Sequence, residues 1–96
     1  MKTLKLFDYT GSFAENKDVA RKIRLEEIIP ALENNELVVL NFEHVDSATQ
    51  SFVHALLSDL IRLYGSEVLE KIQFKSCSEK VQKIVLMVAD YMQESL

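Results

Sequence analysis

Apolar positions along the chain alternate between short continuous runs and longer segments with helical spacing. Residues 37–42 are almost all apolar, which is typical of a strand in a parallel or mixed sheet that is covered on both faces. Residues 52–64 then carry apolar side chains at i, i+4 and i+8, and Gly65 follows directly. A broad stripe that ends at a glycine predicts an amphipathic helix packed on the sheet.

Two further segments predict strands beside this central one. Residues 4–9 place their side chains alternately on two sides, which indicates a first strand near the edge of the sheet. Residues 68–74 predict a third strand, with Leu69, Ile72 and Phe74 as its core candidates.

The segment between the first two predicted strands is expected to form an imperfect helix. Residues 18–32 have helical spacing with one phase slip between Ile23 and Leu25. Pro30 lies inside the second half, so it should bend or restart the helix.

The last helix is predicted from Ser76 and Glu79, which have the spacing of a capping box. One apolar face follows, made of Val81, Ile84, Val85, Val88 and Met92. Leu86, Met87 and Tyr91 lie elsewhere on this helix. They are explained either by burial inside the domain or by a surface for a partner or a homodimer.

The 96 residues therefore predict a single domain, 1–96, of the α/β class. The expected architecture is a small mixed sheet with helices in the order β-α-β-α-β-α. No apolar run approaches the roughly 18 residues of a membrane span, and the N-terminus lacks a signal-peptide core, so we expect a cytoplasmic protein.

Charge argues against a nucleic-acid partner, because the formal net charge is −4 and the basic residues are scattered. Only Arg21, Lys22 and Arg24 form a small cluster, which is either a solvated helix face or a patch for a phosphate or an acidic partner. Cys77 is the single cysteine, which excludes a disulfide framework and favours a small buried apolar residue over a nucleophile.

The start of the central helix can have two registers. If Ser47 is the N-cap, Gln50 completes a capping box; if Thr49 is the N-cap, Ser51 becomes the second helical residue. In both registers Ser51 lies in the first turn, away from the apolar stripe, where solvent should reach it. A phosphate there would meet free backbone N–H groups and the positive helix end. The alternative is that Ser51 simply caps the helix.

Other chemistry in this region is less well supported. His44, Asp46 and Ser51 are the residue types of a hydrolytic triad, but no glycine-flanked nucleophile accompanies the serine. The potential metal ligands lack a short ligand spacing; they are His44, Asp46, His54 and Cys77. No glycine-rich loop is present to hold a nucleotide. We expect no catalytic residue, no cofactor and no metal.

The segment from Val38 to Phe52, a strand, a polar turn and a Ser-Phe helix start, resembles the STAS domain of sulphate transporters and anti-sigma-factor antagonists. It is more similar to the STAS-like family of unknown function. The resemblance covers about residues 11–76. The antagonists carry an aspartate two residues before the serine and a Gly-Leu-Gly nearby, where this chain has Thr49 and the segment 52–54.

The resemblance implies a non-catalytic protein-interaction domain in bacterial-type signalling. In the antagonists, the serine that matches Ser51 is phosphorylated by a kinase that is also an anti-sigma factor, and phosphorylation ends binding. The implied partner is a histidine-kinase-type ATPase, and phosphorylation of Ser51 would add negative charge beside Asp46. The predicted partner-binding residues are Asp46, Ser47, Thr49, Gln50, Ser51, Phe52 and His54. The alternatives are a small enzyme or ligand-binding domain that uses His44, Asp46 and Ser51, and a structural dimerisation module.

Overall fold

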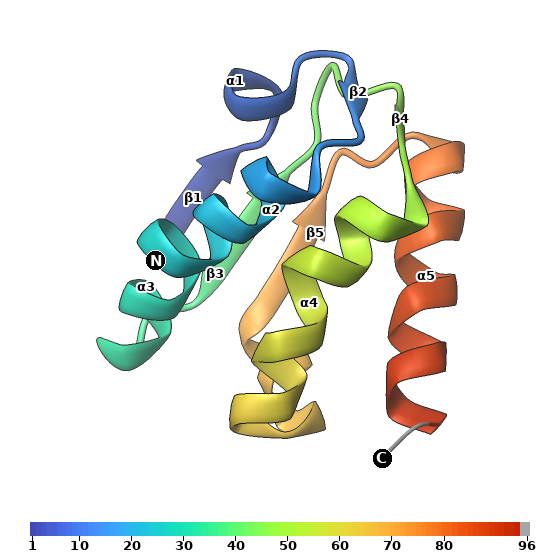
Figure 1. Cartoon of the computed structure of the whole chain (residues 1–96). Coiled ribbons are helices and arrows are strands. Elements are labelled where there is room, and N and C mark those ends of the chain that lie inside the picture. The colour runs from blue at the N-terminus through green and yellow to red at the C-terminus, as the bar shows by residue number, and fades with distance from the viewer. Residues whose placement is uncertain (95–96) are drawn as a thin grey trace.

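The computed structural model describes residues 1–94 as strands and helices in alternation (Figure 1). The main sheet has three parallel strands in the order β1-β3-β5, with bounds Lys2–Lys5, Val38–Asn41 and Ile72–Lys75. A second pair, β2 (Phe13–Ala14) and β4 (Ser47–Ala48), is also parallel. The α/β class is confirmed, but every described strand pair is parallel, so the predicted mixed sheet is wrong.

The helices are α1 (Phe7–Thr10), α2 (Lys17–Ile23), α3 (Ile29–Glu33), α4 (Gln50–Tyr64) and α5 (Glu79–Glu94). Helices α2, α3 and α4 lie in front of the main sheet, and α5 lies beyond β5 and packs against α4 (Figure 1). None of the helices in residues 1–94 is long and apolar enough to span a bilayer.

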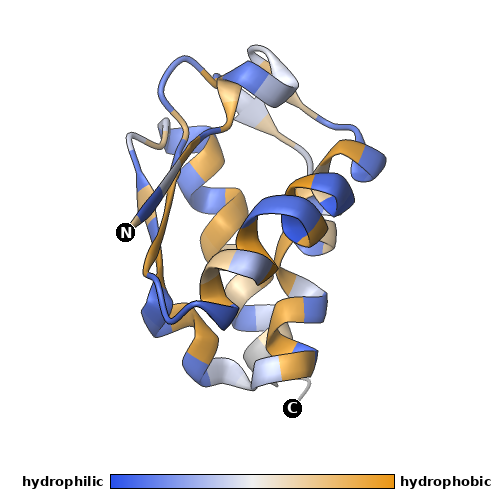
Figure 2. Cartoon of the chain, turned by 90° about the vertical axis from the view of Figure 1, so that its left-hand side faces the viewer, coloured by the Kyte–Doolittle hydropathy of each residue, from blue (hydrophilic) through white to orange (hydrophobic). Residues whose placement is uncertain are grey.

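The two faces of the main sheet differ in polarity. The row Leu4, Leu40 and Phe74 points toward the helices and joins the core. The next row, Thr3, Val39 and Gln73, points to the opposite face, where Thr3 and Gln73 are exposed. Figure 2 shows the strands along one side of the molecule with the helices on the other. Val38, Val39 and Leu40 are buried as predicted, but Leu37 is 45% exposed and the helices lie on one face of the sheet instead of two (Figure 2).

The phase slip in the first long helix has a structural cause. Between α2 and α3 the chain forms a π-helical turn over Arg24–Ile28. A π turn contains one more residue than an α turn. This extra residue lets Ile23 and Ile28, before and after the phase slip, both be buried. Pro30 lies in the first turn of α3, directly after the π-helical turn, so the helix restarts at the proline as predicted.

Two strand predictions and one cap prediction need correction. The first strand ends at Lys5, because Tyr9 and Thr10 donate backbone hydrogen bonds to the Leu6 carbonyl and close one helical turn. The third strand begins only at Ile72, since residues 66–71 form a 3₁₀ helix. The last helix is capped by Ser78, whose hydroxyl oxygen accepts from the Val81 N–H at 3.2 Å, and not by the predicted Ser76.

Candidate functional site

The candidate site begins where β4 meets α4. Thr49 is the N-cap: its backbone is extended, and its hydroxyl oxygen accepts a hydrogen bond from the Phe52 N–H at 3.0 Å. The Thr49 N–H donates to the Ala14 carbonyl at 2.9 Å, which fixes the entry of the helix against β2. The second of the two predicted registers is therefore confirmed, and Ser51 is the second residue of α4.

Replacing Thr49 by alanine is expected to lower the free energy of unfolding by about 1 kcal/mol, because it removes this cap. Thr49→Ser keeps the hydroxyl and should retain most of the stability. Urea unfolding followed by circular dichroism measures both. Equal destabilisation by the two variants would show that the cap is not the stabilising group.

The turn before Thr49 is held by backbone contacts. The Asp46 N–H donates to the Ser12 carbonyl at 2.8 Å, and the Asp46 carbonyl accepts from the Ser78 hydroxyl at 2.8 Å. His44 has a φ of 71°, a left-handed conformation that few non-glycine residues adopt. These contacts join the turn to the residue before β2 and to the residue before α5. The turn that leads into α4 is therefore held at both of these segments.

The predicted partner-binding residues differ in accessibility. Asp46, Gln50, Ser51 and His54 are exposed, and Ser47 and Thr49 are half-buried. Phe52 is 0% exposed and belongs to the core, so its predicted contact with a partner is wrong. Its ring is directed inward because the apolar stripe of α4 begins at this residue. The remaining six residues stay as predicted candidates.

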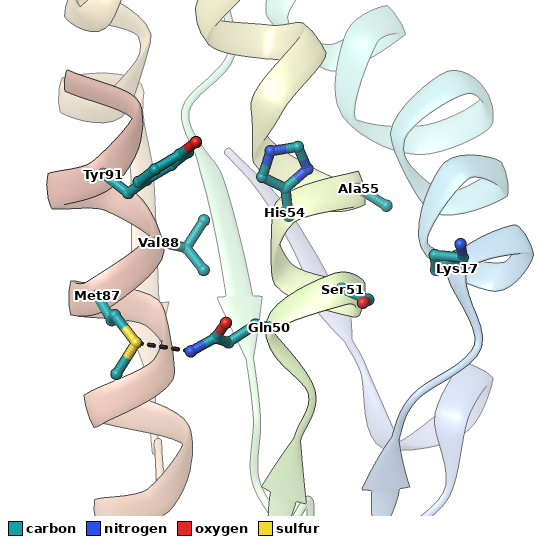
Figure 3. Close-up of a pocket in the computed structure, with 8 residues that line it drawn as sticks. All are labelled: Lys17, Gln50, Ser51, His54, Ala55, Met87, Val88 and Tyr91. Atoms are coloured by element: carbon teal, nitrogen blue, oxygen red, sulfur yellow. Dashed lines mark hydrogen bonds between the residues drawn. The ribbon is translucent and has the colours of Figure 1, made fainter. Parts of the chain in front are cut away.

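A hollow of about 480 Å³ lies beside Ser51 and extends over the first turns of α4. Its lining comes from three helices: Lys17 of α2, then Gln50, Ser51, His54 and Ala55 of α4, and Met87, Val88 and Tyr91 of α5 (Figure 3). The Gln50 amide donates to the Met87 sulfur at 2.7 Å and joins α4 to α5. Local spacing predicts Gln50, Ser51 and His54 as part of the candidate site, whereas no pattern in the sequence distinguishes Lys17.

The residues considered above as a hydrolytic triad or as metal ligands do not gather around this hollow. His44 lies in the turn, 3.2 Å from a Glu43 carboxylate oxygen and edge-on to Phe7, and neither His44 nor Asp46 lines the hollow. Among the described residues, no three His, Cys, Asp or Glu side chains form a potential metal site. Burial raises the pKa of the Cys77 thiol, which keeps it in the less nucleophilic protonated form.

The predicted basic cluster is divided by the π-helical turn. Arg21 and Lys22 are exposed, whereas Arg24 is only 6% exposed. The Arg24 guanidinium donates to the Ala55 carbonyl and lies 3.1 Å from an Asp59 oxygen. Arg24 is therefore part of the contact between α2 and α4. Both explanations offered for the basic cluster, a solvated helix face and a binding patch, are wrong for this residue.

Exposed apolar side chains on α5 lie next to the hollow. Leu86, Met87 and Tyr91 are 58%, 50% and 61% exposed, so the wholly internal explanation for them is wrong. Their use in a homodimer or in contact with another protein stays a prediction.

The sequence comparison agrees with this arrangement of strand, turn and helix. A family model described as STAS-like domain of unknown function (DUF4325) matches residues 19–82, which is more than half of the chain. The chain belongs to the STAS-like domain family. The matched region of this STAS-like domain runs from α2 into α5 and includes the whole of α4 with Ser51. No curated protein and no solved structure shows significant similarity to the chain.

Proposed function

We propose that this STAS-like domain acts by binding another protein, without catalysis, and that phosphorylation of Ser51 controls the binding. One observation carries the proposal: the Ser51 side chain is exposed in the first turn of α4, yet Thr49 caps the helix. Within the described residues the Ser51 hydroxyl makes no hydrogen bond. A serine that is not needed for the cap is available for modification.

Electrostatics at this position favour a phosphate. A phosphoserine carries about −1.5 to −2 charges, and the positive end of a helix stabilises such a group by roughly 0.3–1 kcal/mol. Lys17 lines the same hollow and supplies a second positive charge. Phosphorylation would thus change both the charge and the shape of this surface.

The proposed contact surface consists of the turn and the exposed face of α4. It contains Asp46, Ser47, Thr49, Gln50, Ser51 and His54. The partner is proposed from the family resemblance to be a histidine-kinase-type ATPase of bacterial-type signalling, acting in the cytoplasm. A phosphate on Ser51 would repel acidic groups of the partner that face the start of α4, and its bulk would disturb a close contact there.

The proposal is tested by affinity capture from the native host with wild-type, Ser51→Ala and Ser51→Glu baits. We expect wild type and Ser51→Ala to retain the same partner, and Ser51→Glu to lose it by about tenfold or more, as like-charge contact at an interface requires. Quantitative mass spectrometry measures the retained proteins. Incubating the captured ATPase with ATP and the domain then tests whether Ser51 is phosphorylated.

Ser66→Glu is the matched control, because Ser66 is exposed at the start of the 3₁₀ helix after α4 and does not line the hollow. It adds the same charge at a position outside the proposed surface and should leave capture unchanged. Equal capture by Ser51→Glu and wild type would contradict the switch. Loss of capture with both glutamate variants would show only an effect of net charge and would also contradict it.

A further inference from the structure

The hollow beside Ser51 combines two kinds of lining. Polar groups come from Lys17, Ser51 and His54, on α2 and α4. Met87 and Val88 give an apolar wall on α5, next to the Tyr91 ring (Figure 3). A volume of about 480 Å³ lies within the range of roughly 300–1,000 Å³ that is usual for sites of small molecules.

The charge of the lining selects the kind of ligand. The chain has 15 acidic residues against 11 basic ones, but no carboxylate of the described residues lines this hollow. Asp59, one turn beyond Ala55, pairs with Arg24 at 3.1 Å and with Arg62 at 3.2 Å. The hollow is therefore a site without negative charge on a protein of net charge −4.

Hydrogen-bond donors lie at the start of α4, where Gln50 and Ser51 are part of the lining of the hollow. The Thr49 hydroxyl and carbonyl accept from the N–H groups of Phe52 and Val53. The N–H groups of Gln50 and Ser51, in contrast, have no acceptor within residues 1–94. The Ser51 hydroxyl and the Lys17 ammonium add two more donors to this lining.

We propose that the hollow binds a small molecule with an anionic group joined to a flat apolar group, of which an aryl phosphate is the simplest example. The anionic group contacts the ammonium of Lys17 and the donors of Ser51. The flat group lies on the side of Met87 and Tyr91. This ligand site goes beyond the proposed function and does not depend on it, although a bound anion and a phosphate on Ser51 would exclude one another.

Titration of the purified domain with phenyl phosphate, followed by ¹⁵N–¹H NMR spectra, tests the proposal. We expect saturable shifts of the amides of Gln50, Ser51 and Met87, with a dissociation constant on the order of 1 mM. Inorganic phosphate and phenol, which each lack one half of the ligand, should bind at least about threefold more weakly.

Paired variants assign the two ends of the site. Lys17→Gln should weaken binding of phenyl phosphate by about threefold to fivefold, because it removes an ion pair at an exposed position. Lys22→Gln removes the same charge from an exposed residue of α2 that does not line the hollow, and should change nothing. Met87→Ala should weaken phenyl phosphate but not inorganic phosphate, and Leu86→Ala, its exposed neighbour, is the control.

Three results would overturn the proposal. These are shifts that do not saturate, equal binding of phenyl phosphate and inorganic phosphate, and equal effects of Lys17→Gln and Lys22→Gln. The NMR spectra also report whether each variant is folded. Since the titration uses the isolated domain, its failure would leave the result of the capture experiment untouched, and the reverse also holds.

Discussion

Replacing Phe52 by alanine is expected to lower the free energy of unfolding by about 3–5 kcal/mol. The Phe52 side chain is 0% exposed and is among the largest fully buried side chains of the domain. Removing its ring loses the transfer free energy of the apolar atoms and leaves a cavity beneath the first turn of α4. A loss of this size is a large part of the roughly 5–15 kcal/mol that stabilises a typical domain.

The neighbouring serine provides the control for this prediction. Ser51→Ala changes an exposed side chain that makes no hydrogen bond to the part of the chain that the structure describes, so the free energy of unfolding should change by less than about 0.5 kcal/mol. Urea unfolding of the two variants measures the difference. Similar stabilities of Phe52→Ala and Ser51→Ala would contradict the separation of the Ser-Phe pair into a surface residue and a core residue.

Replacing Arg24 by alanine is expected to cost about 2–4 kcal/mol. The guanidinium holds α2 to α4 through the Ala55 carbonyl and Asp59, and its aliphatic stem is buried. Asp59 keeps a second partner, Arg62, so the carboxylate is not left unpaired. The cost therefore comes mainly from the lost packing and from the Ala55 carbonyl.

Two variants separate these contributions. Arg24→Met keeps an apolar stem of similar length and removes the buried Nε, which has no hydrogen-bond partner among the described residues. It should therefore cost only about 1–2 kcal/mol. Arg62→Ala removes an exposed ion pair and should cost less than about 1 kcal/mol. Urea unfolding at low and at high salt measures the free energy of unfolding of Arg24→Ala, Arg24→Met and Arg62→Ala. An Arg24→Ala cost that disappears at high salt would contradict a buried role, since salt screens mainly exposed pairs.

The central part of the fold could be predicted because its signals are local. The run at 37–42 and the stripe at 52–64 define β3 and α4, and the phase slip after Ile23 marks the π-helical turn. The predicted strands at 4–9 and 68–74 are too long, because apolar residues there suit a strand, a helical turn or a 3₁₀ helix equally well. Backbone hydrogen bonds to Leu6 and the pairing with β3 decide between them.

The candidate site also has a part that local sequence patterns predict and a part that depends on tertiary packing. The position of Ser51 follows from local spacing, but the hollow beside it requires Lys17 and Met87, which come from segments far away in the chain. Which residues of two helices face one another depends on tertiary packing, and a single sequence does not encode it in a local pattern. The burial of Arg24 could not be predicted either. Its place beside Arg21 and Lys22 in the sequence suggests an exposed cluster, but the π-helical turn directs it inward.

The order β1-β3-β5 also affects how the chain folds. Both hydrogen-bonded pairs of the main sheet contain β3, and each joins segments about 35 residues apart in the sequence. Forming the sheet therefore requires the closure of two long loops, and the chain entropy lost in closing them opposes it. Helices α4 and α5, in contrast, form their backbone hydrogen bonds between residues close in sequence. Strands β1 and β5 do not pair with each other, so the ladder hydrogen bonds that hold either strand in the main sheet are made to β3 alone.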